Sequence, residues 1–368
     1  MTRISSFAEY NARLRGFITT SEPDQAGFNQ LALALFALQF AHVEPYRRLC
    51  MARRVSPDKV SRWTEIPGIP SAAFKEFELT SLPVEERAAV FHSSGTSAQR
   101  PSRHFHSLES LAIYESSLLP WFKAHLLPET GKFAFVLLTP SPDSAPCSSL
   151  AHMFETVRRA FGSSDSLFSG QTDSTGAWVL DWDTTFDALR KFIGWERPLA
   201  LLGTAFSFVH LIDALATRHL IFTLPAGSRA LETGGYKGRS RTMPQAELRA
   251  LITRHLGIPA SHIVGEYGMS ELSSQAYDCT AGSPERGTRN ETRTFQFPPW
   301  ARVRMVCPET GREVVEGETG LIQVYDLANI RSVLAVQTED LGIRRGQGFE
   351  WIGRGALAEP RGCSLMHL

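Results

Sequence analysis

The stretch His262-Ile-Val-Gly-Glu-Tyr-Gly-Met-Ser-Glu271 has the greatest bearing on the fold. Residues 262–265 predict a short strand that leads into polar residues, and Gly268 permits a sharp turn there. Upstream, residues 246–256 carry the apolar spacing of a helix that ends at Gly257. Thr242 followed by Gln245 predicts a capping box at the start of that helix. A helix, a strand and a polar turn in this order indicate an α/β sheet.

Outward from this stretch, short apolar runs alternate with amphipathic segments, which favours a largely parallel sheet covered by helices. The chain after Pro299 differs, because short β-rich runs are separated by turn residues and predict a small antiparallel subdomain. The expected strands are 133–139, 177–180, 199–202, 220–224, 302–306, 320–325 and 333–336, and the expected helices include 184–193 and 206–217.

Composition excludes several classes of protein. The chain has 368 residues with 38 basic and 38 acidic side chains, so no global charge attracts nucleic acid or an anionic membrane. The apolar run Leu31–Ala41 is too short to span a bilayer, which needs about 20 residues, and predicts a helix buried on all sides. No signal peptide is recognisable, and the five scattered cysteines suit reduced thiols, so a cytoplasmic location is expected.

The segment Ser93-Ser94-Gly95-Thr96-Ser97 offers four hydroxyl groups and one permissive glycine after an apolar run. Polyphosphate binding requires many donors and a close backbone approach, and this composition supplies both. A polar surface loop has the same composition, so the segment alone leaves both interpretations open.

The segment from Glu266 to Glu271 is more specific. The ring of Tyr267 can stack on a base, Gly268 permits the turn, and the Ser270 hydroxyl and Glu271 carboxylate can meet a phosphate and a magnesium ion. A strand-to-turn junction with solvated carboxylates is the alternative interpretation.

Three further candidates belong to the same pattern. The paired glycines Gly234 and Gly235 let a flat ligand lie against the backbone, and Lys237 can neutralise phosphate. Asp340 can accept hydrogen bonds from ribose hydroxyls, and Arg354 can donate to the same ribose or to a phosphate. Each is individually compatible with an ordinary turn.

The order and spacing of these motifs resemble the adenylate-forming superfamily of acyl-CoA synthetases, luciferases and adenylation domains, and most closely its LuxE-type acyl-protein synthetases. The resemblance covers nearly the whole chain. Its segments are Pro45-Tyr46 with Cys50, Ile66-Pro67 to Phe74-Lys75, Ser93 to His104, Glu232 to Arg239, Glu266 to Glu271, and Gly353 to Ser364.

The resemblance implies that the chain activates a carboxylic acid, expected to be a fatty acid, with ATP and Mg²⁺. It assigns phosphate to Ser94, Gly95, Thr96 and the flanking Ser93 and Ser97, adenine to Tyr267, Gly268, Gly234 and Gly235, and phosphate and Mg²⁺ to Ser270 and Glu271. It further assigns ribose to Asp340, the Gly-Arg hinge to Gly353 and Arg354, and acyl acceptance to Cys363. The expected catalytic residues are Cys363, Glu271 and Lys237. A partner acyl reductase or acyl carrier would receive the acyl group.

The implied organisation has four parts. Residues 1–90 form a helical N-terminal region, 91–299 an α/β nucleotide- and acyl-binding core, 300–353 a small β subdomain and 354–368 an acyl-acceptor tail. The superfamily's mobile C-terminal domain, which normally brings a catalytic lysine, is expected to be absent or vestigial.

Two departures keep alternatives open. Ala98 and Pro101 stand where the superfamily loop has a glycine and a lysine, although Arg100, Arg103 or Lys237 can compensate. These departures support the alternative of a non-catalytic scaffold of a reductase complex. The chief alternative is a ligase that passes the acyl group to CoA or a carrier thiol, in which case Cys363 would be incidental.

Overall fold

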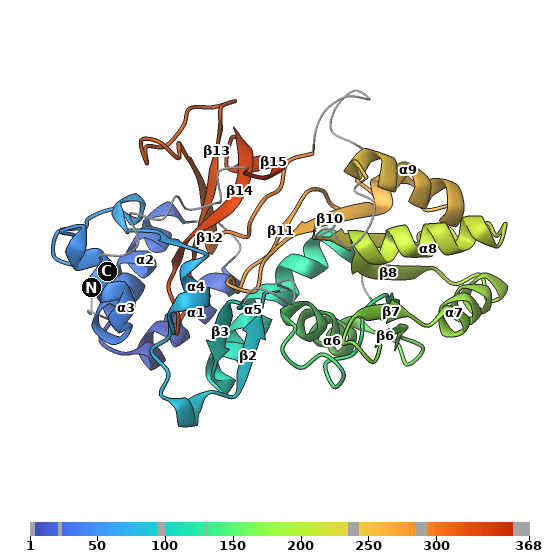
Figure 1. Ribbon diagram of the computed structural model, residues 1–368, viewed down its shortest axis with the longest axis horizontal. Coiled ribbons are helices and arrows are strands. Elements are labelled where there is room, and N and C mark those ends of the chain that lie inside the picture. The colour runs from blue at the N-terminus through green and yellow to red at the C-terminus, as the bar shows by residue number, and fades with distance from the viewer. Residues whose placement is uncertain are drawn as a thin grey trace. The chain divides into compact units, whose positions relative to one another are not determined.

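The computed structural model describes residues 4–20, 24–93, 100–129, 131–234, 243–283 and 293–355. It divides into two compact units, which are described separately (Figure 1). Unit 1 comprises Met1–Leu118, Met269–Gln275 and Thr294–Leu368, and unit 2 comprises Leu119–Gly268 and Ala276–Arg293.

Unit 1 begins with helices. The helix expected over Leu31–Ala41 is present, but it is not buried on all sides: four of its side chains between Leu31 and Phe40 are half-buried and Ala41 is exposed. Among the described residues no single helix is long and apolar enough to cross a membrane. The helices Gln25–His42 and Glu44–Ala52 together have the length and composition of a membrane span, but they are bent by 106° relative to each other. The helices of this unit are α1 (Phe7–Thr19), α2 (Gln25–His42), α3 (Glu44–Ala52), α4 (Ala73–Glu76) and the first part of α5 (Leu108–Leu126), with 3₁₀ turns at Trp63–Glu65 and Val84–Glu86.

Two sheets complete unit 1. The larger runs β1-β14-β13-β12, with β15 also paired to β14, and the smaller is the hairpin of β2 and β3. The four strands from β12 to β15 pair antiparallel, each with the next along the chain, which agrees with the β-rich character after Pro299. Strand β1 is an unexpected parallel neighbour of β14. The strands are β1 (Ile69–Pro70), β2 (Ala89–His92), β3 (Arg103–His106), β12 (Ala301–Val306), β13 (Thr319–Asp326), β14 (Ala335–Arg345) and β15 (Gly348–Arg354).

Unit 2 contains a six-stranded sheet of order β11-β10-β9-β8-β4-β5, parallel except for β11, and the separate hairpin β6–β7. This sheet confirms the expected largely parallel α/β core. Its strands are β4 (Ala134–Leu137), β5 (Leu167–Phe168), β6 (Gly170–Thr172), β7 (Trp178–Leu180), β8 (Leu199–Thr204), β9 (Arg229–Thr233), β10 (Ile263–Tyr267) and β11 (Ala276–Tyr277). Its helices are α6 (Ser149–Phe161), α7 (Trp182–Gly194), α8 (Ala205–Thr217), α9 (Gln245–Leu256) and the end of α5, with a 3₁₀ turn at Ala260–His262.

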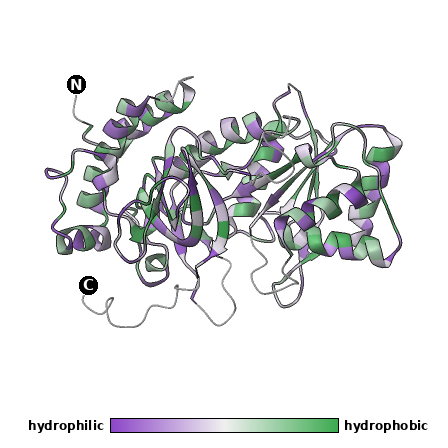
Figure 2. Cartoon of the chain, turned by 90° about the horizontal axis from the view of Figure 1, so that it is seen from above, coloured by the Kyte–Doolittle hydropathy of each residue, from purple (hydrophilic) through white to green (hydrophobic). Residues whose placement is uncertain are grey.

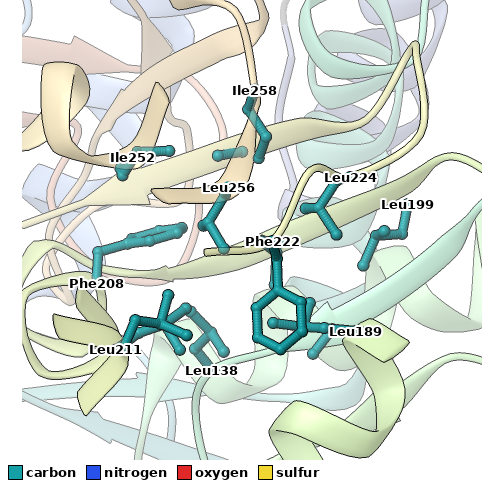
Figure 3. Close-up of a cluster of buried hydrophobic side chains, with 14 of the residues drawn as sticks. Leu138, Leu189, Leu199, Phe208, Leu211, Phe222, Leu224, Ile252, Leu256 and Ile258 are labelled. Carbon is teal, nitrogen blue, oxygen red and sulfur yellow. The ribbon is translucent and has the colours of Figure 1, made fainter. Parts of the chain in front are cut away.

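The core of unit 2 lies between the sheet and its helices (Figure 3). Leu189 of α7, Phe208 of α8 and Ile252 of α9 all contribute buried side chains to it. The same helices carry hydrophilic residues on their other faces (Figure 2). Burying one apolar stripe per helix against a sheet is what stabilises this layered architecture.

Two details of unit 2 differ from the expectation. Residues 220–224 are not a strand, because the Phe222 and Leu224 amides donate to the carbonyls of His255 and Leu256 at the end of α9. The alternating Phe222 and Leu224 side chains are buried in the core instead (Figure 3).

The start of α9 also differs. Its N-cap is Pro244, without a side-chain cap, and Thr242 lies outside the described residues. Its other end confirms the prediction, because Gly257 adopts the left-handed conformation, with φ of 70°.

Candidate active site

The carboxyl ends of two neighbouring parallel strands bring two of the motifs together in unit 2. In the register of β9 and β10, Thr233 lies opposite Glu266. Gly234, with φ of 71°, follows Thr233, and Tyr267 follows Glu266. Ligands of open parallel sheets bind outside these strand ends, so Gly234 and Tyr267 occupy the expected edge. Gly235 and Lys237 lie outside the described residues.

A buried ionic network links the two strands that form this edge to helix α9. The Arg249 guanidinium of α9 contacts the Glu232 carboxylate of β9 at 2.7 Å and the Asp278 carboxylate at 2.6 Å. Asp278 also accepts a hydrogen bond from the Gly265 amide at 2.7 Å. A Cβ atom at Gly265 would come within 2.5 Å of the Arg249 guanidinium and 2.7 Å of the Asp278 carboxylate, so a larger residue would displace these two paired side chains. The strand of the motif is therefore bonded by Asp278, which Arg249 in turn links to α9 and to Glu232 of β9.

Glu266 is buried beside this network. The Thr233 hydroxyl donates to its carboxylate, yet burial dominates and raises the pKa of Glu266 to about 7. The nearby Glu232 carboxylate acts in the same direction. A carboxyl group with this pKa exists in both protonation states near neutral pH.

The second half of the motif, from Met269, belongs to unit 1. The Ser270 hydroxyl donates to the Glu271 carboxylate at 3.1 Å, and both residues are buried. The main chain is anchored at both positions, since His104 Nδ1 lies 2.8 Å from the Ser270 carbonyl oxygen and Asn329 Nδ2 donates to the Glu271 carbonyl at 2.9 Å. The predicted phosphate and metal residues therefore sit on a segment with fixed backbone.

Residues just after the motif are held by a carboxylate that sequence reasoning missed. Asp326, at the end of β13, accepts from the Ser273 amide at 2.8 Å and from the Ser274 hydroxyl at 2.7 Å. Burial raises the pKa of Asp326 above its ordinary value, and these hydrogen bonds oppose that rise. Asn329 accepts from the Ser273 hydroxyl at 2.7 Å. The Asp-x-x-Asn spacing is the only local signal, and it does not by itself indicate a site.

The first motif begins at the hairpin of β2 and β3 in unit 1. The Ser102 amide donates to the Ser93 hydroxyl at 3.0 Å, and Phe91 pairs with His104 across the hairpin. Ser94, Gly95, Thr96, Ser97 and Ala98 lie outside the described residues. Arg103, considered as a substitute for the missing lysine, forms an ion pair with Glu78 at 3.0 Å.

The proposed ribose residues are neighbours in unit 1. Asp340 of β14 and Arg354 of β15 are paired directly across the antiparallel ladder. The Gly355 amide donates to the Glu339 carbonyl at 2.9 Å, so the ladder continues past Arg354. Gly353 has φ of 141°, a conformation that side-chain-bearing residues rarely adopt. The sequence predicts ribose binding by Asp340 and binding of the same ribose or a phosphate by Arg354, and the sheet places these two residues opposite each other.

The described cysteines differ in chemical character. Burial raises the pKa of Cys50 to about 11 and that of Cys279 to about 12, so both thiols are protonated at neutral pH. Hydrogen bonds from Thr310 lower the pKa of the Cys307 thiol. Cys363, the expected acyl acceptor, lies outside the described residues.

Within the described ranges, no cluster of three or more His, Cys, Asp or Glu side chains could hold a metal ion. A lone carboxylate such as Glu271 is nevertheless compatible with magnesium, because Mg²⁺ in nucleotide enzymes is bound by one or two carboxylates together with substrate phosphates and water.

Comparison with known proteins identifies the family. The model of the family described as "Acyl-protein synthetase, LuxE" matches residues 14–367 of this chain. A relative from Aliivibrio fischeri, the long-chain-fatty-acid–luciferin-component ligase, is 20% identical over 350 residues, which cover 92% of this chain and 86% of that protein.

Solved structures show the fold. A 2-hydroxyisobutyryl-CoA ligase with 2-HIB-AMP and CoA matches with a TM-score of 0.63 at 13% identity, covering 90% of this chain and 69% of that one. The amide bond synthetase McbA from Marinactinospora thermotolerans matches with a TM-score of 0.50 at 15% identity, covering 74% and 49%. The fold is thus that of the adenylate-forming enzymes. The chain belongs to the LuxE family of acyl-protein synthetases, AMP-forming ligases that use ATP to activate an acyl group.

Proposed function

We propose that this ligase converts a long-chain fatty acid to an acyl-adenylate and then carries the acyl group on its own Cys363. The proposal is carried by the meeting of Gly234 and Tyr267 at adjacent carboxyl ends of β9 and β10, in a chain that matches the family over nearly its whole length. The substrate class is supported by the name of the A. fischeri relative.

In the first step a carboxylate oxygen attacks the α-phosphorus of ATP, and pyrophosphate leaves. The transition state accumulates charge on phosphate oxygens, which donors and cations stabilise. Tyr267, with Gly268, Gly234 and Gly235, would hold adenine, and Asp340 and Arg354 would hold ribose. Thr96 with its neighbours and Lys237 would bind phosphate. Glu271, with Ser270 donating to it at 3.1 Å, would place Mg²⁺.

In the second step the Cys363 thiol loses its proton and its sulfur attacks the acyl carbon. A thioester forms, and AMP leaves. Cys363 lies eight residue steps beyond Gly355, the last described residue, whose amide donates to the Glu339 carbonyl of β14, and the extended length of eight steps limits the separation to about 29 Å. Tethering at this range gives the thiol an effective concentration on the order of mM. A partner acyl reductase or acyl carrier would then take the acyl group.

The test is incubation of the purified protein with ATP, Mg²⁺ and a panel of saturated fatty and aromatic acids. We expect acid-dependent ATP–pyrophosphate exchange, and intact mass should show one acyl adduct that hydroxylamine removes. Exchange without an adduct, together with transfer to added CoA or a carrier thiol, would identify an external acceptor. Absence of both exchange and ATP binding in folded protein would support a non-catalytic scaffold.

A further inference from the structure

Two buried histidines lie side by side on β3, the strand that leaves the predicted phosphate loop. His104 and His106 have ring centroids 4.3 Å apart and are each 2% exposed. Their hydrogen bonds run in different directions. His104 Nδ1 contacts the Ser270 carbonyl oxygen at 2.8 Å, whereas His106 Nδ1 contacts the Ser110 hydroxyl of α5 at 3.3 Å.

The contact between His104 and Ser270 defines the tautomer of His104. A carbonyl oxygen only accepts hydrogen bonds, so Nδ1 carries the proton and donates. The Ser270 carbonyl satisfies the Nδ1–H group of His104, so this group needs no water. The aromatic ring of Phe74 packs edge-on against His104, with ring centroids 6.1 Å apart. Burial lowers the pKa of His104 to about 4, which keeps the ring neutral at physiological pH.

The same strand is tied to the first motif. Phe91 and His104 face each other across the hairpin, and the Ser102 amide donates to the Ser93 hydroxyl two residues away from His104. One end of β3 thus borders the predicted phosphate loop, while His104 contacts the segment that carries Ser270 and Glu271.

We propose that His104 is a positioning residue for adenylation, which fixes the Ser270–Glu271 main chain relative to the hairpin that bears Ser93. The inference rests on the proposed function, because it assumes that these two segments serve the same Mg-ATP. His104 acts through the Ser270 carbonyl and has no assigned contact with substrate.

Asn329 makes the neighbouring contact, but it is a poorer test of positioning. Its side chain also bonds the Ser273 hydroxyl and the Val333 carbonyl, so its replacement would disturb several segments at once. His104 offers a sharper substitution, because an Asn amide nitrogen takes nearly the place of the imidazole Nδ1.

The experiment compares His104→Leu, His104→Asn and the matched control His106→Leu. For His104→Leu we expect kcat/KM for Mg-ATP in pyrophosphate exchange to fall about 5- to 50-fold, since one buried hydrogen bond is lost and a carbonyl is left without its donor. His104→Asn should remain within about threefold of wild type. His106→Leu should also do so, even where its melting temperature falls as much as that of His104→Leu. The KM for the acid should stay unchanged in all three.

A second readout does not depend on activity. Hydrogen exchange of residues 269–275 should accelerate about threefold or more in His104→Leu and not in His104→Asn or His106→Leu. If His104→Leu does not fold, His104→Gln takes its place, because its amide lies too far out to reach the same carbonyl.

The inference is overturned if the folded Leu or Gln variant keeps both wild-type kinetics and wild-type exchange of residues 269–275. It is equally overturned if His104→Asn loses as much kcat/KM for Mg-ATP as His104→Leu. The same holds if His106→Leu shows the kinetic loss and the faster hydrogen exchange expected of His104→Leu. If the wild-type protein shows no pyrophosphate exchange and binds no Mg-ATP, the proposed function itself is refuted. His104 then has no role in adenylation, whatever the hydrogen exchange of its variants shows.

Discussion

Glu266 and Glu271 stand five residues apart and experience different environments. Glu266 is the penultimate residue of β10, is buried, and has a pKa raised to about 7. The Glu271 carboxylate accepts a hydrogen bond from the Ser270 hydroxyl. The main-chain carbonyls of Ser270 and Glu271 accept hydrogen bonds from His104 and Asn329, respectively. The first carboxyl group therefore influences stability through protonation, and the second is the candidate for metal placement.

Replacing Glu271 with Ala should reduce pyrophosphate exchange about 100-fold or more, because Mg²⁺ would be poorly placed on the phosphates. The variant should need more Mg²⁺ for half-maximal rate while its KM for the acid stays the same. Glu247→Ala, an exposed glutamate on α9, serves as the control. A fully active Glu271→Ala enzyme would remove Glu271 from the mechanism.

Glu266 should make stability depend on pH. Between pH 4.5 and 7 the unfolded chain has lost this proton while the native chain retains it, so the free energy of unfolding falls as pH rises through this window. The loss is on the order of 3 kcal/mol at most. Denaturant unfolding of Glu266→Gln should lack this contribution. Parallel pH dependences for variant and wild type would contradict the raised pKa.

Thr96 tests the phosphate loop. Thr96→Val keeps the shape of the side chain and removes the hydroxyl, and a hydrogen bond to a charged group is worth about 1.5–3 kcal/mol. The kcat/KM for ATP should therefore fall by roughly one to two orders of magnitude. Thr217→Val, on the exposed end of α8, should have no such effect. Unchanged ATP dependence would make the segment an ordinary surface loop.

At the scale of elements, helix α9 and strands β9 and β10 are joined by charge as well as by apolar packing. Arg249, 8% exposed, bridges Glu232 of β9 and Asp278 beyond β11. Buried charges are tolerated only when paired, so this network constrains how the helix lies on the sheet edge that carries Tyr267.

Arg249→Met should destabilise the protein by about 3–5 kcal/mol, because Glu232 and Asp278 would be left buried without their partner. Arg190→Met breaks an exposed pair with Asp187, whose side chains are 57% and 76% exposed, and should cost less than about 1 kcal/mol. Chemical denaturation measures both. Equal stabilities of the two variants would show that the buried network contributes little.

At the scale of the whole molecule, acyl transfer depends on which thiol reacts. Cys363→Ser should retain pyrophosphate exchange and lose the hydroxylamine-labile adduct. Cys307→Ser is the matched control, because hydrogen bonds from Thr310 lower the pKa of the Cys307 thiol. Its replacement should leave the adduct in place. A thioester that persists in Cys363→Ser would place the acyl group elsewhere.

Local sequence determined much of this protein. The apolar run of α2, the glycine that ends α9, the strand β10 with its polar turn, and the β-rich character after Pro299 were all predictable. The LuxE resemblance was predictable for the same reason, since its motifs are short and contiguous. Helix periodicity, glycine conformation and turn chemistry are properties of a few neighbouring residues.

Only the tertiary structure decided the contacts between distant residues. β1 pairs with β14 more than 260 residues later, Phe222 and Leu224 pack in the core without forming a strand, and His104 reaches the Ser270 carbonyl. Arg249 finds Glu232 and Asp278 only when α9 lies on the sheet. Such contacts depend on which apolar faces are buried together, and this burial is shared by the whole fold, so no local pattern specifies it.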